Sequence, residues 1–182
     1  MNQRAERRVA LLRGINVGRA TRIAMADLRA CTEAAGCREV STVLATGNVV
    51  LTDPRPPAEL RSVLEAAFAT RFSYNAVVQV LSRAELDSAA SSYPFATLDE
   101  HHDYLVFADH PEVTERVVEA MAVAIDAEGT EAVAAGPGCV FWRVPRGATL
   151  TSAAAAVLDT PDVRQHLTTR NLNTVRRILA VG

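Results

Sequence analysis

Residues 40–52 read VSTVLATGNVVLT, two apolar, β-branched runs on either side of Thr46-Gly47-Asn48. Short runs rich in valine and threonine are typical of strands. A turn that contains glycine and asparagine supplies the positive φ angles that a tight hairpin requires. The stretch therefore predicts a β-hairpin with one strand over 40–45 and the next over 49–52.

The segments on both sides of this hairpin each contain one strand and one helix. Upstream, residues 9–12 form a compact apolar run typical of a buried strand, and apolar residues recur at helical spacing over 25–35. Downstream, prolines precede a helix with its buried face over 60–68, and 76–81 is the next strand. The order strand, helix, strand, strand, helix, strand is the ferredoxin-like split βαβ pattern.

The second part of the chain begins the same order again in a degenerate form. A helix and a polar loop over 82–103 precede a strand at 104–108, and His110-Pro111-Glu112 then starts a helix. Two more strands, at 131–134 and 139–144, flank a Gly-Pro-Gly turn. Helices near 152–158 and 171–179 close the chain.

These elements predict an α+β protein with two ferredoxin-like (split βαβ) halves in tandem. We expect antiparallel sheets with helices on one face and extra C-terminal helices. The expected boundaries are 1–81 for the first half, 82–103 for the connecting helix and loop, and 104–182 for the second half with its C-terminal helices.

The composition is that of an ordinary globular protein. Of the 182 residues, 49% are hydrophobic and 22% are charged, which is enough apolar material for a core without disulfide or metal staples. All 19 basic residues are arginine, yet the net charge is −2. That balance argues against general nucleic-acid binding, and the third strand lacks the aromatic residues of RNA-binding domains with this fold.

Cysteine usage and hydropathy predict a cytoplasmic protein without membrane association. Cys31, Cys37 and Cys139 form no CxxC pair, so reduced thiols explain them better than disulfides do. No apolar run approaches the roughly 18 residues of a membrane span, and the N-terminus lacks the apolar region of a signal peptide. The oligomeric state is left open.

One rim of the first half gathers polar residues from distant parts of the chain. In a split βαβ sheet the third strand lies antiparallel beside the first, so Gly47-Asn48 should lie beside Arg13-Gly14. The connection that begins Arg13-Gly14-Ile15-Asn16-Val17-Gly18 is also longer than the usual median of about 4–6 residues. Glycine N–H groups with arginine and asparagine side chains form a plausible anion cradle.

The candidate ligand-binding residues follow from this placement. On the rim they are Arg13, Gly14, Asn16, Gly18, Gly47 and Asn48, with Arg19, Arg22, Thr46 and Tyr74 nearby. If the final helix packs near the rim, Arg170, Asn171 and Asn173 join the same site. Each of these residues also has a turn-building or helix-capping explanation, and the spacing matches neither the dinucleotide fingerprint nor the P-loop.

Three functions are compatible with this pattern. The first is a binding module for a small anionic ligand that bears phosphate or carboxylate. The second is a protein-interaction or scaffolding domain in which the motifs are structural, and the third is an enzyme of unknown reaction on the same rim. No nucleophile motif is present, so we assign no catalytic residue and no cofactor.

The segment Asp99-Glu100-His101-His102-Asp103 contains metal-ligating residue types, but we expect no metal site there. Adjacent residues on an extended chain point to opposite sides and rarely ligate one ion together.

Several motifs resemble the bacterial family known as domain of unknown function 1697. They are the run from Val9 to Gly18, the segments 23–29 and 46–50, and the closing segment 169–175. The resemblance implies a two-part α+β structure of ferredoxin-like halves and no established activity. Two positions depart from the family pattern: Leu172 stands where tryptophan is usual, and residues 146–150 replace a Gly-x-Ser-Lys-Leu stretch.

Overall fold

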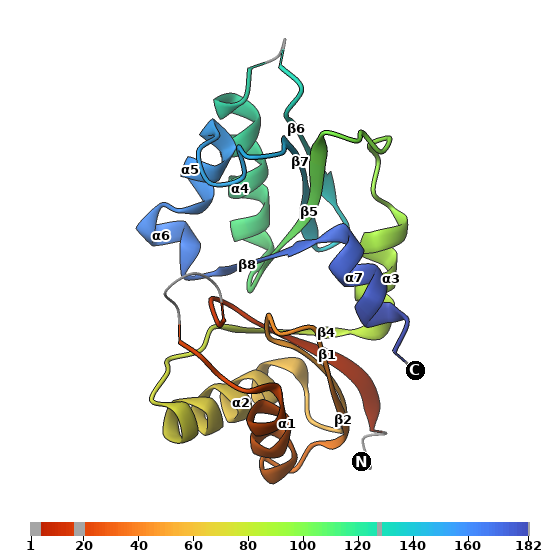
Figure 1. Cartoon of the computed structure of the whole chain (residues 1–182), viewed down its shortest axis with the longest axis vertical. Coiled ribbons are helices and arrows are strands. Elements are labelled where there is room, and N and C mark those ends of the chain that lie inside the picture. Colours follow the sequence, from red (N-terminus) through yellow and green to blue (C-terminus); the bar gives the residue numbers. More distant parts are fainter. Residues whose placement is uncertain (1–4, 17–20, 127–128, 182) are drawn as a thin grey trace. The chain divides into compact units, whose positions relative to one another are not determined.

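The computed structural model describes residues 5–16, 21–126 and 129–181, which form eight strands and seven helices (Figure 1). Contacts divide the chain into two compact units. Unit 1 comprises residues 1–86 and 177–182, and unit 2 comprises residues 87–176. Each unit contains one antiparallel four-stranded sheet with helices, so the predicted α+β class with two ferredoxin-like halves is confirmed. The boundaries at 81 and 103 stay a prediction.

Unit 1 has the sheet order β2-β3-β1-β4. Its elements are β1 (Glu6–Leu12), α1 (Met25–Ala34), β2 (Arg38–Val43), β3 (Asn48–Asp53), α2 (Pro57–Phe72), β4 (Val78–Ser82) and the start of α3 (Arg83–Ser91). The third strand lies antiparallel beside the first, with Leu11 opposite Asn48. This is the arrangement on which the predicted rim depends.

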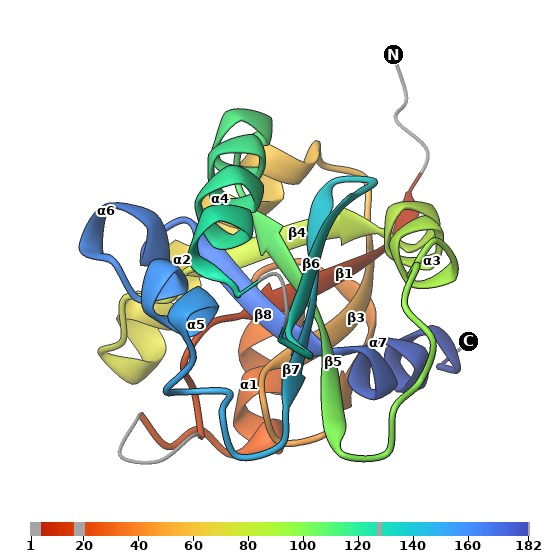
Figure 2. The same ribbon diagram turned by 90° about the horizontal axis from the view of Figure 1, so that it is seen from above.

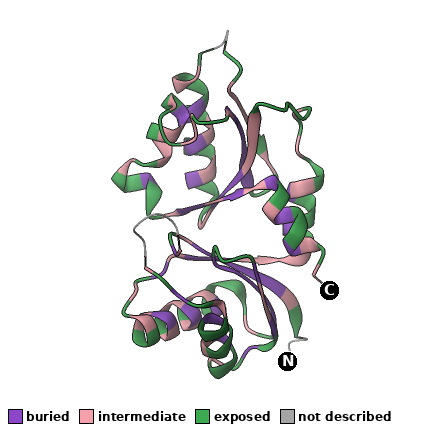
Figure 3. Cartoon of the chain, in the orientation of Figure 1, coloured by how far each residue is buried: buried purple, intermediate pink, exposed green. Residues whose placement is uncertain are grey.

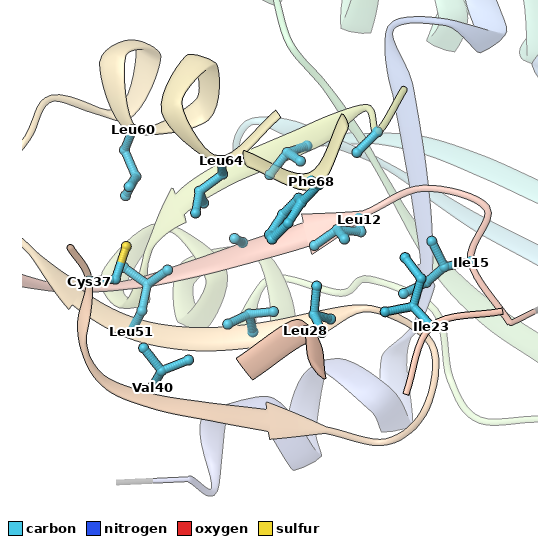
Figure 4. Close-up of a cluster of buried hydrophobic side chains, with 14 residues drawn as sticks. Leu12, Ile15, Ile23, Leu28, Cys37, Val40, Leu51, Leu60, Leu64 and Phe68 are labelled. Atoms are coloured by element: carbon cyan, nitrogen blue, oxygen red, sulfur yellow. The ribbon is translucent and has the colours of Figure 1, made fainter. Parts of the chain in front are cut away.

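The core of unit 1 lies between the sheet and the helices α1 and α2 (Figure 4). Leu12 on β1 and Leu51 on β3 face Leu28 of α1 and Phe68 of α2, and all four are completely buried. Alternate residues of β1 point to opposite faces of the sheet, and from Arg8 to Leu12 the strand is buried on both (Figure 3). That is why the strand reads as a continuous apolar run rather than as an alternating one.

Unit 2 has the sheet order β6-β7-β5-β8. Its elements are the end of α3, β5 (His101–Ala108), α4 (Pro111–Ala124), β6 (Ala132–Gly136), β7 (Cys139–Pro145), α5 (Ala153–Leu158), α6 (Pro161–Arg164), β8 (Leu167–Asn171) and most of α7 (Leu172–Leu179). The helices α4 and α5 lie on the same side of this sheet (Figure 2), where Val117 and Met121 pack against Val106 and Trp142.

The strand β8 and the short helix α6 were not predicted. The sequence predicts a helix over 171–179, and α7 covers Leu172–Leu179, but residues 167–171 before it pair antiparallel with β5. The run Thr168-Thr169-Arg170-Asn171 contains residues that favour helix caps, and five residues show too little alternation to reveal a strand. The pairing with β5 is a long-range contact that no local pattern encodes.

Candidate functional site

Three segments of unit 1 meet where β1 ends. The Leu12 amide donates to the Gly47 carbonyl at 2.8 Å, and the Arg13 amide donates to the Val77 carbonyl at 3.0 Å. The Tyr74 hydroxyl donates to the Arg13 carbonyl. The end of β1, the β2–β3 turn and the connection before β4 therefore form one rim, as the topology predicts.

Asn16 holds this rim together through its side chain. Its Nδ2 group donates to the Ile23 carbonyl at 2.7 Å and to the Ala45 carbonyl at 2.8 Å, while Oδ1 accepts from the Ile23 amide at 2.9 Å. Its backbone is left-handed, with φ of 55°, a conformation that asparagine tolerates better than most residues. Both amide donors are thus occupied by backbone carbonyls.

The β2–β3 turn is built around Gly47 and Asn48. Asn48 is completely buried, and its Nδ2 group donates to the Val43 carbonyl at 2.8 Å and to Thr46 Oγ1 at 3.1 Å. Gly47 has φ of 76°, and a Cβ atom there would lie 2.9 Å from Leu12 Cβ. A side chain at position 47 is therefore excluded by both backbone conformation and space.

Two arginines flank this fixed loop. Arg22 is exposed, and its Nη1 group lies 3.4 Å from the Asn16 carbonyl oxygen. Burial raises the pKa of the Tyr74 hydroxyl, and the positive charge of Arg13 opposes that rise. Gly14, the residue after Arg13, has a φ of 66°. Arg22 therefore places its guanidinium beside Asn16, and the backbone of Arg13 is held on the same rim by Val77 and Tyr74.

The apolar side chains of the loop are anchored in the core below it. Ile15 is fully buried and Ile23 is 4% exposed, and both belong to the cluster that contains Leu12 and Leu28 (Figure 4). A bridge pairs Ile15 with Thr21. Residues 15 and 16 and residues 21–23 are therefore held by both hydrogen bonds and packing. Gly18, also a candidate, lies outside the described residues.

The candidate residues of the closing motif belong to unit 2. Arg170 is buried on β8, where its Nη1 group donates to Thr168 Oγ1 and to the Thr169 carbonyl, both at 2.9 Å. Burial lowers its pKa to about 10. Asn171 Oδ1 accepts from the Asn173 amide at 2.9 Å, which caps the first turn of α7. That these residues complete the rim stays a prediction.

A buried ion pair at the end of β3 was not predicted from the sequence. Asp53 is completely buried, and Arg55 binds both of its carboxylate oxygens, at 2.8 and 2.6 Å. Arg55 also donates to the Ala35 carbonyl at the end of α1. The sequence feature that could have revealed this pair is the acid and the arginine on either side of Pro54. A proline-rich segment after a strand, however, is explained more simply as the start of a helix.

A second missed network lies in unit 2. Tyr93 donates to Asp103 at 2.6 Å, and Arg143 forms an ion pair with the same carboxylate at 3.3 Å. The Arg143 guanidinium lies 5.0 Å from the ring centroid of Phe95. Burial, reinforced by Asp103, strongly raises the pKa of Tyr93. This network pairs charges that lie 40 residues apart in sequence, and it fastens the connection after α3 to β5 and β7.

Unit 1 also has two surface concavities. One, of about 720 Å³, is lined by Arg7, Arg29, Glu33, Glu39, Val40, Ser41 and Arg83. Its arginines contribute to the fold, since Arg29 pairs with Glu33 at 2.9 Å and Arg83 binds carbonyls after α7. The other, of about 360 Å³, lies between α1 and α2 beside Cys31. Burial raises the pKa of the Cys31 thiol, which disfavours the nucleophilic thiolate.

Within residues 5–16, 21–126 and 129–181, no group of three His, Cys, Asp or Glu side chains is arranged to hold a metal ion. None of the described helices combines the length and the apolar character needed to cross a bilayer.

Residues 5–141 match the model of a protein family described as a protein of unknown function (DUF1697). The chain belongs to this family. No curated protein sequence matches it. Among solved structures, it is similar to the conserved bacterial protein SP0830 from Streptococcus pneumoniae, with a TM-score of 0.77 and 25% identity over 97% of this chain and 98% of that one.

A microcompartment protein from Desulfitobacterium hafniense aligns over 92% of this chain and 94% of its own, at 15% identity and a TM-score of 0.29. The family match and the pneumococcal structure agree with the resemblance seen in the N-terminal motifs.

Proposed function

We propose that this protein is a binding module for a small anionic ligand, bearing phosphate or carboxylate, at the rim around Arg13 and Arg22. The observation that carries the proposal is a cationic segment whose described residues are bound to the fold. Residues 13–25 contain three arginines and no acidic residue, and side-chain bonds from Asn16 and Tyr74 hold the backbone at Arg13 and Ile23.

Rigidity matters because a preformed site avoids the cost of ordering its groups when the ligand binds. Arginine suits such a ligand, since its planar guanidinium donates two parallel hydrogen bonds to a carboxylate or phosphate. Each charge-assisted hydrogen bond is worth about 1.5–3 kcal/mol. One such bond from each of Arg13 and Arg22, about 3–6 kcal/mol together, would therefore support a Kd between roughly 6 mM and about 40 μM.

The test is a thermal-shift and calorimetric screen of the whole chain with inorganic phosphate, nucleotides, phosphorylated metabolites and dicarboxylates. A ligand that binds the folded state raises Tm by mass action. We expect Arg13→Gln and Arg22→Gln to remove the shift, while Arg29→Gln retains it. Arg29 is the matched control because it is an exposed arginine on α1 that pairs with Glu33.

Two results would refute the proposal. One is a screen in which no anion changes Tm. The other is an anion that still binds Arg13→Gln and Arg22→Gln as tightly as it binds the parent. Catalysis at the same rim would require, in addition, turnover of the bound anion that Arg13→Gln abolishes while Tm is unchanged.

A further inference from the structure

The two sheets have four edge strands. In three of them, a side chain forms a hydrogen bond with a backbone group of the edge strand. On β2, Arg7 donates to the Glu39 carbonyl at 2.8 Å, and the pairing with β3 is broken by an irregularity after Arg38. On β4, Glu65 accepts from the Val78 amide at 3.0 Å. On β8, Arg170 donates to the Thr169 carbonyl at 2.9 Å.

The fourth edge, β6, has no such protection. Its residues are Ala132-Val133-Ala134-Ala135-Gly136, without charge or proline, and its register with β7 is unbroken from Ala132 to Gly136. In the part of the chain that the structure describes, no side chain binds the backbone of β6. Proteins usually protect such edges with charges, bulges or covering segments, because free N–H and C=O groups recruit further strands.

We propose that β6 is a homodimerisation edge, at which two copies of this chain pair antiparallel about a two-fold axis and join their β6-β7-β5-β8 sheets into one. The occupant follows from the composition of the edge. Specific recognition of a foreign peptide would require distinctive side chains on the edge, and β6 offers only alanine, valine and glycine. A second copy needs only the backbone ladder and an absence of repulsion.

Self-pairing brings identical residues close together, which penalises a charged edge and favours a neutral one. Antiparallel pairing about an axis at Ala134 sets Ala135 of one copy opposite Val133 of the other, and no like charges meet. The same operation on β2 would bring the exposed, charged residues Arg38 and Glu39 near their own copies. The two edges are thus opposite in character.

Two exposed apolar side chains lie on segments that contact β6 or the residue before it. Val123, in the last turn of α4, is 87% exposed, and α4 packs against β6. Leu150 is 91% exposed and lies two residues before Ser152, whose hydroxyl donates at 2.7 Å to Glu131, the residue that precedes β6. A five-residue strand pair buries much less than the roughly 1,200–2,000 Å² of a stable interface, so the dimer is weak and concentration-dependent.

The experiment combines sedimentation velocity with hydrogen exchange of the whole chain, in the absence of ligand, from about 10 μM to about 1 mM, the range in which weak association is populated. We expect a monomer–dimer equilibrium, and slower exchange of the amides of β6 as the concentration rises. Ala135 is exposed, so Ala135→Lys should leave the fold intact and raise the dimer Kd by tenfold or more through repulsion across the axis.

Ala66→Lys is the matched control, because it adds the same charge at an exposed alanine of α2 in unit 1 and should leave the Kd unchanged. The proposal is overturned if the protein stays monomeric throughout, or if Ala135→Lys dimerises as the parent does. It is equally overturned if the protein dimerises but the exchange rate of the β6 amides does not change with concentration. This last test uses the parent protein alone.

Discussion

Replacing Asn16 tests whether its side chain builds the rim. In Asn16→Ala the Ile23 amide, the Ile23 carbonyl and the Ala45 carbonyl all lose their side-chain partner. The backbone at position 16 is also left-handed, with φ of 55°, which a residue with a Cβ atom adopts at a cost. Asn16→Gly removes the same three bonds but accepts this backbone conformation readily, so the pair of variants separates the two contributions.

The expected magnitudes follow from the bonds. A hydrogen bond in a protein contributes about 0.5–1.5 kcal/mol net, so three are worth about 3 kcal/mol. The bond to Ala45 is exposed, and water replaces part of it. We therefore expect Asn16→Gly to lower the free energy of unfolding of unit 1 by about 2–3 kcal/mol. Asn16→Ala should lose about 1 kcal/mol more, because the left-handed conformation disfavours alanine.

Urea denaturation followed by far-UV circular dichroism measures these losses, since the tryptophan, Trp142, lies in unit 2 and does not report on unit 1. Hydrogen exchange should show faster exchange at the Ile23 amide, which donates to Asn16 Oδ1. Losses below about 0.5 kcal/mol in both variants would mean that the three bonds do not hold the loop. Equal losses in Asn16→Ala and Asn16→Gly would refute the contribution of the left-handed backbone.

Three further changes have definite expected outcomes. Gly47→Ala should cost about 2–4 kcal/mol in urea denaturation, because the new Cβ meets Leu12 at 2.9 Å, whereas Gly138→Ala, also left-handed but with open space, should cost only about 1–2 kcal/mol. Arg55→Ala should cost about 3–5 kcal/mol by leaving the buried carboxylate of Asp53 unpaired; a loss near that of a surface substitution would contradict this. Burial raises the pKa of Asp53, but the hydrogen bonds from Arg55 outweigh burial and the net pKa is lowered. The stabilisation by this ion pair should therefore be complete at neutral pH and be lost only below about pH 4. If the stability of Asp53→Asn falls with decreasing pH in the same way as that of the parent, this reasoning is refuted.

The first half of the fold was predictable because its signals are local. Gly47 and Asn48 between two β-branched runs predict the hairpin, and the structure places positive φ at Gly47. The second half was less so, because β8 depends on pairing with β5 from a distant part of the chain. β5 itself begins at His101, three residues before the predicted start. Its polar residue Asp103 is satisfied there by Arg143, a partner that the sequence could not identify.

The candidate site was predictable in its location but not in its chemistry. Topology alone placed the end of β1 beside Gly47-Asn48, and the structure sets Leu11 opposite Asn48 and bonds the Leu12 amide to the Gly47 carbonyl, just before the predicted Arg13-Gly14. The pattern could not separate side chains that face a ligand from those that bind the backbone. Asn16 has the same sequence signal in either role, since asparagine suits both a cradle and a left-handed turn.

On the rim, the asparagine side chains bind the backbone and the arginines carry the positive charge, so effects on stability and effects on binding can be measured separately. Both amide donors of Asn16 reach backbone carbonyls, as Asn48 Nδ2 reaches Val43 and Thr46, so a ligand could gain these donors only by disrupting the loop. The anion binding that we propose for this rim rests on the positive charges of Arg13 and Arg22. Binding through arginine weakens as salt screens the charges, whereas hydrogen bonds from a neutral amide hardly change. A ligand held here should thus lose affinity with rising ionic strength, and asparagine substitutions should change stability at every salt concentration.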